Sequence, residues 1–315
     1  MKLLIHLFLL SLLSLCAKDI EPYKFIQASE AVSDFVKVGG KLIIGTEEGI
    51  IDIYDLKKDK LTDQVILKKQ KSIMGDNIRS LILSVDYLDG KLIFIKRLLS
   101  TVRELYIYEN KKLTKLLDES KGMELQKIKF VDADTIMMAT MDNALILFDL
   151  KNKKIKYKKQ LNLASFSDFA ISEDKKYIFT ADETPQITKI EIKSGKIIDV
   201  FNKANKRDVF SIDYKHGLLL SGGKDKRVIL YKTPTSYKMT KGSFFIYAVA
   251  LSPDGSKAAF VKNENSEISI IDTQTLEEKH LLKGHKQTVF KIDFHTSNEL
   301  ITADEADKLM LWKLK

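Results

Sequence analysis

The sequence of 315 residues contains one cysteine, four prolines and one tryptophan. The single cysteine, Cys16, lies at the end of an apolar N-terminal run, so we expect no disulfide, thiolate metal site or cysteine nucleophile in the remaining chain. After that run, no stretch reaches the roughly 20 apolar residues that a transmembrane helix needs. The remaining chain is therefore expected to fold without covalent cross-links and without a membrane-spanning helix.

Arginine is also scarce, because only five of the 52 basic residues are arginine and the other 47 are lysine. The formal net charge of +9 would otherwise indicate a nucleic-acid partner, but arginine is the usual reader of phosphates and base edges. Many of the lysines lie in turns, as in residues 151–154. We therefore expect a solvated basic surface and no nucleic-acid binding, with electrostatic steering toward an acidic partner.

The first 17 residues predict a secretory signal peptide. Lys2 supplies a positive end, Leu3–Leu15 form an apolar run, and small residues follow. Cleavage after Cys16 or the next residue would release a mature protein into the periplasm. A lipid anchor on Cys16 is the alternative, although Leu15 stands where lipoproteins carry a small residue. Residues 18–315 show no linker and no shift in composition, so we expect them to form a single domain.

The last stretch of the chain, residues 284–315, has the pattern of a structural repeat. Gly284-His285 opens it, and residues 289–294 alternate apolar and polar side chains, as a half-buried strand does. A turn, a second strand, an acidic turn and a third strand with Trp312 follow. This stretch resembles one WD40 repeat, which is a blade of a β-propeller.

The position of Trp312 recurs upstream, each time in a short apolar strand. Its counterparts are Tyr54, Tyr108, Phe148, Ile190, Tyr231 and Ile271. The steps between the seven positions are 54, 40, 42, 41, 40 and 41 residues, and blade repeats are expected about every 40–45 residues. The sequence therefore predicts an all-β fold, a seven-bladed WD40-like β-propeller.

The two ends of the chain predict how the ring closes. The last repeat has three strands, and an isolated strand precedes the first repeat. An open ring would expose a long hydrophobic edge. We therefore expect Tyr23–Ala28 to pair with the strand that holds Trp312, so that the N-terminal strand closes the last blade.

The second repeat is lengthened by two insertions, residues 68–78 and 96–103. In a propeller, the loop before the inner strand and the loop between the second and third strands lie on the same face, so both insertions should share one rim. Arginine and methionine are enriched in interface cores. Our hypothesis is that a protein partner with an acidic face contacts Met74, Asp76, Arg79, Arg97 and Arg103. The alternative is that these loops only pack on each other.

The last repeat also contains the residue types of the buried hydrogen-bond network of WD40 blades: His285, Thr302, Asp307 and Trp312. We interpret this network as structural, because catalysis would need an accessible nucleophile and a cleft. The spacing of the acidic residue differs between repeats. Asp307 lies five residues before Trp312, whereas Asp225 lies six residues before Tyr231.

No catalytic, cofactor or metal site is expected. The sequence 221–225 joins two strands and lacks the spacing of a phosphate loop, and the other histidines lack metal-ligand spacing. The alternative is a propeller enzyme, of the lyase or quinoprotein dehydrogenase type, which would need polar residues converging on the central channel. The inner strands offer mainly apolar or scattered residues: Phe35, Val85, Ile128, Phe169, Ser211, Val249 and Ile292. A non-enzymatic binding scaffold is therefore favoured.

The second repeat carries a family resemblance. Residues 73–78 (IMGDNI), 84–87 (SVDY) and 106–110 (YIYEN) are similar to the NapL family, which are signal-bearing WD40-like accessory proteins of the periplasmic nitrate reductase. The resemblance implies a periplasmic scaffold in nitrate assimilation that supports maturation or activity of this molybdenum-containing enzyme. We also expect the protein to be a monomer. It supplies no catalytic residues and no cofactor. A third alternative, a lipid-anchored component of an outer-membrane assembly machine, depends on lipidation of Cys16.

Overall fold

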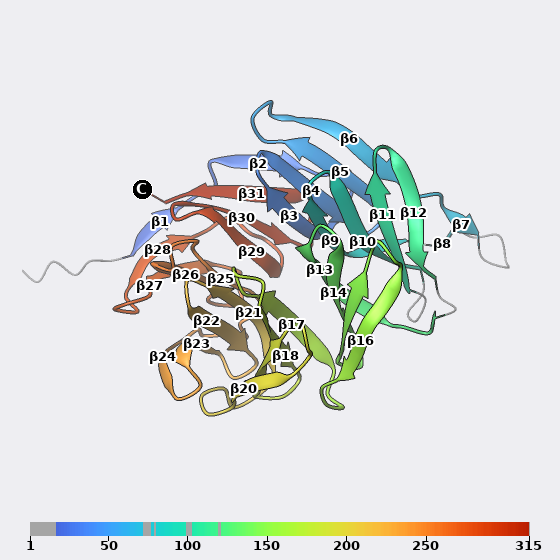
Figure 1. Ribbon diagram of the computed structural model, residues 1–315. Coiled ribbons are helices and arrows are strands. Elements are labelled where there is room, and N and C mark those ends of the chain that lie inside the picture. Colours follow the sequence, from blue (N-terminus) through green and yellow to red (C-terminus); the bar gives the residue numbers. More distant parts are fainter. Residues whose placement is uncertain (1–16, 72–76, 79, 99–102, 119–120, 315) are drawn as a thin grey trace, which may run out of the picture.

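The computed structural model describes residues 17–71, 77–78, 80–98, 103–118 and 121–314. Seven sheets, each built on four antiparallel strands, surround a central axis as blades (Figure 1), and this part of the chain contains no α-helix. The seven-bladed β-propeller predicted from the repeat spacing is therefore confirmed. In the described residues, no helix is long and apolar enough to cross a membrane.

The first four blades follow the chain from the inner strand outward. Blade one comprises β3 (Val32–Val38), β4 (Lys41–Thr46), β5 (Ile50–Asp55) and β6 (Lys60–Ile66). Blade two comprises β9 (Leu81–Leu88), β10 (Lys91–Arg97), β11 (Arg103–Glu109) and β12 (Lys112–Leu117), after a small hairpin of β7 (Gln70–Lys71) and β8 (Asn77–Ile78). Blade three comprises β13 (Leu125–Asp132), β14 (Thr135–Thr140), β15 (Ala144–Asp149) and β16 (Lys154–Gln160). Blade four comprises β17 (Phe166–Ile171), β18 (Tyr177–Asp182), β19 (Ile187–Glu191) and β20 (Ile197–Phe201).

The last three blades complete the ring. Blade five comprises β21 (Val209–Lys215), β22 (Leu218–Gly223), β23 (Arg227–Thr233) and β24 (Ser236–Lys241). Blade six comprises β25 (Val249–Leu251), β26 (Lys257–Val261), β27 (Ile268–Asp272) and β28 (Glu278–Leu282). Blade seven comprises β29 (Val289–Thr296), β30 (Glu299–Asp304) and β31 (Lys308–Lys313), and two N-terminal strands, β1 (Lys18–Ile20) and β2 (Lys24–Gln27), join the last two blades.

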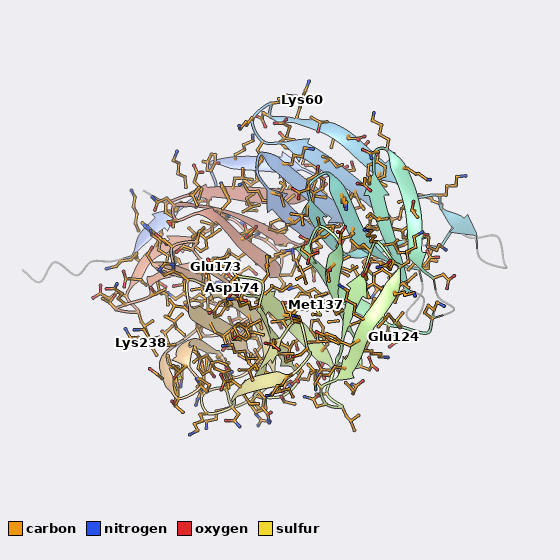
Figure 2. All side chains as sticks on the ribbon, viewed as in Figure 1. Lys60, Glu124, Met137, Glu173, Asp174 and Lys238 are labelled. Carbon is orange, nitrogen blue, oxygen red and sulfur yellow. The ribbon has the colours of Figure 1, made fainter. Side chains whose placement is uncertain are left out.

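The hydrophobic core is divided among the junctions between blades. Each cluster of buried apolar side chains in the described residues draws from two neighbouring blades, and together the clusters cover all seven junctions. The middle strands are consequently buried on both faces, as in β14, in which every residue is buried. The outer strands face solvent and carry lysines such as Lys60 on β6 and Lys238 on β24 (Figure 2), which protect a free edge from pairing with another chain.

The residues that predicted the repeat all lie in the third strand of their blades. These strands are β5, β11, β15, β19, β23, β27 and β31, in chain order. Trp312 and Tyr231 are fully buried, and so are the aliphatic or aromatic side chains of Phe148, Ile190 and Ile271. Tyr54 and Tyr108 are partly exposed and pack against the clusters of their junctions. The period of about 40 residues therefore marks one large side chain per blade that packs toward a neighbouring blade.

The N-terminal segment closes the ring at two places. β2 pairs antiparallel with β31 of blade seven, with Phe25 opposite Met310, which confirms the predicted closure. β1 adds a second contact that the sequence did not indicate, because it pairs parallel with β28 of blade six. Ile26 and Ala28 are buried in the cluster between blades seven and one. The segment 18–28 therefore connects three consecutive blades.

Deletion of residues 18–29 should lower the free energy of unfolding by on the order of 4 kcal/mol, because it removes the buried Ile26 and exposes the edges of β28 and β31. Deletion of residues 18–20 alone should cost less, since β1 is mostly exposed. The measurement is denaturant unfolding of both deletions beside Phe25→Ser, an exposed position on the same strand. Equal stability of the full-length chain and the longer deletion would contradict this closure.

Candidate functional site: the central channel and its mouth

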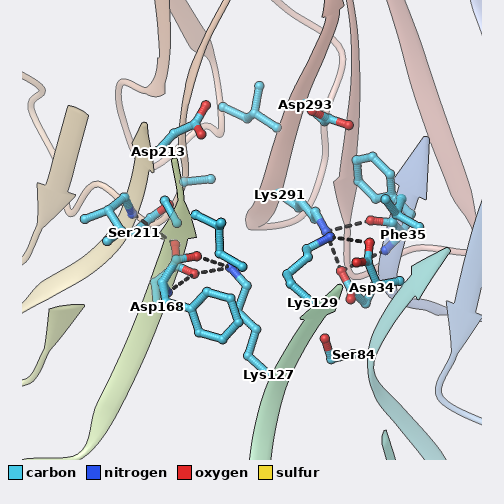
Figure 3. A pocket seen from close by; sticks show the side chains of 18 of the residues that line it. Asp34, Phe35, Ser84, Lys127, Lys129, Asp168, Ser211, Asp213, Lys291 and Asp293 are labelled. Carbon is cyan, nitrogen blue, oxygen red and sulfur yellow. Dashed lines mark hydrogen bonds and ion pairs between the residues drawn. The ribbon is translucent and has the colours of Figure 1, made fainter. Parts of the chain in front are cut away.

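The inner strands of the seven blades surround a cavity of about 760 Å³ along the central axis. Its wall is charged, with six acidic and six basic side chains from the inner strands and adjoining turns. The acidic residues are Asp34, Asp86, Asp168, Glu173, Asp213 and Asp293, and the lysines are Lys37, Lys127, Lys129, Lys175, Lys215 and Lys291. Figure 3 shows several of these side chains pointing into the cavity from different blades.

Most of the channel acids bond to the main chain of the next blade. Asp34 of β3 accepts the N–H of Val85 at 2.8 Å, and Asp86 of β9 accepts the N–H of Phe130 at 2.7 Å. An inner strand is the edge of its sheet, so half of its main-chain groups face the channel and need partners. The carboxylates supply these partners from the preceding blade.

The same arrangement recurs further around the ring. Asp168 of β17 accepts the N–H of Ile212 at 3.0 Å, and Asp213 of β21 accepts the N–H of Leu251 at 2.8 Å. Ser84 does the same for the N–H of Ile128 at 3.2 Å. A hydrogen bond to a charged group contributes about 1.5–3 kcal/mol, so these contacts stabilise the junctions in addition to the apolar clusters.

Lysine replaces the acid at two junctions and reverses the direction of the bond. Lys291 of β29 donates to the carbonyl of Phe35 and to Asp34, both at 2.6 Å. Lys127 of β13 donates to the carbonyl of Phe169 at 3.0 Å and also contacts Asp168. Figure 3 shows both lysines reaching across to the neighbouring blade. Four of the six channel lysines are paired with acids in this way: Lys127, Lys129, Lys215 and Lys291.

One junction lacks these contacts. Blade six has Ala248 and Ala250 where blade five has Ser211 and Asp213, so its inner strand offers no side-chain acceptor to blade seven. This is also the junction that the N-terminal segment spans from outside, through β1 and β2. The N-terminal segment therefore links these two blades at their outer edges.

Asp293 of β29 differs from the other channel acids. In the part of the chain that the structure describes, no hydrogen bond or ion pair reaches its carboxylate. Burial raises the pKa of Asp293, against the lowering effects of Lys215 and Lys291. For Asp34, burial also favours the neutral form, but Lys291 and Lys129 outweigh it and hold the pKa below its usual range. Asp293 is therefore the channel carboxylate with capacity for a ligand.

The charged channel corrects the expectation of a mainly apolar axis. Five of the residues taken from the sequence as channel-facing are buried between blades with exposures of 0–5%: Phe35, Val85, Ile128, Phe169 and Val249; Ile292 is 6% exposed. The side chains that reach the channel are their neighbours in the sequence, such as Asp34 and Lys291. The period of two along a strand places adjacent residues on opposite sides, and the apolar set marks the side that is packed against a blade.

The hydrogen-bond network of blade seven contains three of its four expected members. The ring nitrogens of His285 lie 2.8 Å from Asp304 Oδ2 and 2.6 Å from Thr302 Oγ1, and Trp312 Nε1 donates to Thr302 at 2.7 Å. All of these side chains are buried. The carboxylate belongs to Asp304 and not to Asp307.

Asp307 has a different role from the expected one. Its main-chain oxygen accepts hydrogen bonds from the N–H of Ala28 and the amide of Gln27, at 2.8 and 2.9 Å, so its position supports the pairing with β2. Its side chain is exposed. Blade five repeats the network with other residues, since Asn205 contacts both Ser221 and Tyr231 at 3.1 Å.

The insertions of blade two emerge at one end of the blade, as predicted. Arg97 pairs with Leu81 on one side and with Arg103 on the other, because β10 and β11 extend into the second insertion. Arg103 is 4% exposed and donates to Leu125 O and Gln126 Oε1 at 2.8 and 2.7 Å. Its guanidinium connects blades two and three, so it is not a surface contact for a partner.

The other proposed contacts of this patch have different outcomes. Arg97 is partly exposed. Met74, Asp76 and Arg79 lie outside the described residues. Among the described residues, Arg97 is therefore the one member of the predicted blade-two patch that remains accessible to a partner.

A cluster of aromatic side chains lies at the channel mouth beside blades five and six. Phe210 and Tyr247 line the cavity and are stacked with ring centroids 5.7 Å apart. Phe244 and Phe245 lie next to them, with centroids 4.9 Å apart. All four rings are partly exposed. Sequence reasoning missed this mouth cluster because Phe210 is separated from the other three by a whole blade.

The described residues contain no group of three or more histidine, cysteine or acidic side chains that could hold a metal ion. No model of a known protein family matches the sequence, and no curated protein is significantly similar to it. The geometry of the channel and of its mouth is therefore the basis for the functional argument.

The acid assignment in blade seven is tested by a matched pair of variants. Asp304→Ala should lower the free energy of unfolding by about 3 kcal/mol, because it leaves His285 without its buried partner. Asp307→Ala should change it by less than about 0.5 kcal/mol, since the main-chain bonds to β2 remain. Denaturant unfolding of both variants provides the measurement, and the reverse order of effects would overturn the assignment.

Proposed function

We propose that the protein is a non-enzymatic scaffold that binds a protein partner. The observation that carries this proposal is the mouth cluster of Phe210, Phe244, Phe245 and Tyr247 on a rigid seven-bladed ring. Binding residues on such folds collect on loops held by a rigid scaffold, and partly exposed aromatic side chains supply much of the energy of protein interfaces.

The channel charges support the same proposal. Seven of the side chains described above bond to main-chain groups of a neighbouring blade: Asp34, Ser84, Asp86, Lys127, Asp168, Asp213 and Lys291. These groups hold the ring together and have little capacity left for a substrate. A ring stabilised in this way provides a rigid support for the loops at its mouth.

The partner is proposed from the resemblance to the NapL family. On that basis, the protein enters the periplasm and supports maturation or activity of the periplasmic nitrate reductase. The basic surface, with a net charge of +9, fits an acidic partner through electrostatic steering.

An enzyme that uses the channel is the second candidate, and Asp293 is the observation that favours it. This carboxylate faces the cavity, and the described residues give it no ion-pair partner. Burial raises its pKa, which is a property shared with catalytic acids and bases. A second catalytic group beside it is not evident, because the nearby Asp213 and Lys215 contact each other at 3.3 Å.

Complementation of a gene deletion distinguishes the scaffold function from catalysis in the channel. Loss of the gene should reduce periplasmic nitrate reduction, and wild-type protein should restore it. The mouth variant Phe244→Ser/Phe245→Ser should fail to restore it and should lose at least about ten-fold in affinity for the purified reductase in a pull-down titration. Asp293→Asn should restore activity and bind as the wild type does.

All variants must first melt as the wild type does. An Asp293→Asn protein that binds the reductase normally but does not restore nitrate reduction would support channel chemistry instead of a scaffold. A deletion without effect on nitrate reduction would reject the nitrate reductase pathway.

A further inference from the structure

The loop that carries the mouth cluster is held rigidly. Ile246 is fully buried, and a Cβ atom at Gly222 would collide with its Cγ2 atom, so glycine is needed there. A Cβ atom at Gly242 would lie 2.6 Å from the carbonyl oxygen of Lys262. Hydrogen bonds from Ile246 N to Gly223 O at 3.1 Å and from Ser243 N to Lys262 O at 2.8 Å fix the loop to blades five and six.

Because both ends of this loop are anchored, its aromatic residues are presented in one conformation. Phe245 lies 6.4 Å from Phe210 and 6.2 Å from Tyr247, both edge to face. Aromatic side chains of this kind are normally buried, and here none of the four is. A preformed apolar surface loses little conformational entropy when a partner binds.

The loops around the mouth cluster are basic. Six cationic side chains on the loops of blades five to seven on this face are exposed: Lys206, Arg207, Lys224, Lys226, Lys241 and Lys286. Among the described residues of the same loops, the exposed acids are Glu264 on blade six and Glu305 and Asp307 on blade seven, so the cations outnumber them by two to one. Two further acids of these loops are ion-paired, Asp208 with Lys224 of the same set at 2.9 Å and Asp225 with Arg227 at 3.7 Å, which leaves five of the six cations without an acidic partner in the described residues. We call these six cations the basic collar.

We infer that the mouth cluster and the basic collar together bind an acidic segment of a protein partner, with an apolar or aromatic side chain of that segment seated on the four rings. The inference rests on the proposed protein-binding function and specifies the chemistry of the partner. Complementary charge favours this occupant over a neutral or basic one, because like charges across an interface oppose association. This inference places the interface on blades five to seven, whereas the sequence predicted it on the insertions of blade two.

A selection from a random peptide display library on the intact protein tests this inference. Enriched peptides should contain Asp and Glu flanking Phe, Leu or Trp. A synthetic copy of an enriched peptide should bind saturably, with an affinity that falls as salt rises. The variant Phe244→Ser/Phe245→Ser should weaken binding at least about ten-fold.

Matched controls keep the result interpretable. Charge reversal at Lys206, Lys241 and Lys286 to Glu should also reduce binding of the peptide. Reversal at Lys151, Lys154 and Lys193, which are exposed in or beside turns on the opposite face, should not. Tyr237→Ser, at an exposed aromatic position on the outer strand β24, controls for loss of a surface ring. Each variant is compared only if its melting curve matches that of the wild type.

Several outcomes would overturn the inference. These are the absence of enriched peptides, enrichment of basic or neutral peptides, and binding that survives both the aromatic and the collar variants. Binding of an oligonucleotide as strong as that of the peptide would show a general affinity for polyanions instead. If the reductase binds while acidic peptides do not, the scaffold function stands and this assignment of its surface fails.

Discussion

The structure depends on one constraint, which is that the innermost strand of every blade is a sheet edge facing a narrow channel. Its main-chain N–H and C=O groups would lack partners unless side chains supply them. The protein meets this need with a carboxylate, serine or lysine from the preceding blade, as Asp34, Ser84 and Lys291 show. The charges in the channel are therefore mainly a consequence of closing a ring of sheets. A cluster of ionisable groups at the centre of a fold is in this case weak evidence for catalysis.

The N-terminal segment lies at the junction where the inner side-chain bonds are missing. The junction between blades six and seven has Ala248 and Ala250 at its inner edge and lacks the contacts found elsewhere. β1 and β2 hold this junction from the outer edge, and they also cover the free edges of β28 and β31. Neighbouring blades are thus joined by inner side-chain bonds at the other junctions and by the N-terminal strands at the outer edges of blades six and seven. A ring fastened at every junction supports the anchored loop that presents Phe244 and Phe245.

The sequence alone predicted the number of blades, the third strand of each and the closure by β2, because these features depend on local periodicity and on one large apolar residue per repeat. It did not predict the channel charges, because the apolar pattern identifies only the residues that pack between blades. Asp34, which faces the channel, is the sequence neighbour of the packed residue Phe35. Asp304 was missed because the acidic turn holds several candidates and only the fold brings one to His285. The mouth cluster joins Phe210 to residues 244–247 across a blade, and no local pattern reports such a contact. The burial of Arg103 was missed for a similar reason, since its acceptors lie in blade three.

The channel side chains therefore stabilise the ring, and we propose that the mouth binds the partner. The central claim is that the channel carboxylates protect the edges of the inner strands. Amide hydrogen exchange tests this most directly, through the N–H groups of Val85, Phe130, Ile212 and Leu251, which donate to Asp side chains. The account predicts that these amides exchange as slowly as those of the buried strand β14 and that Asp34→Ala releases the N–H of Val85 selectively. Exchange of the four amides at the rate of exposed loops in the wild-type protein would contradict it.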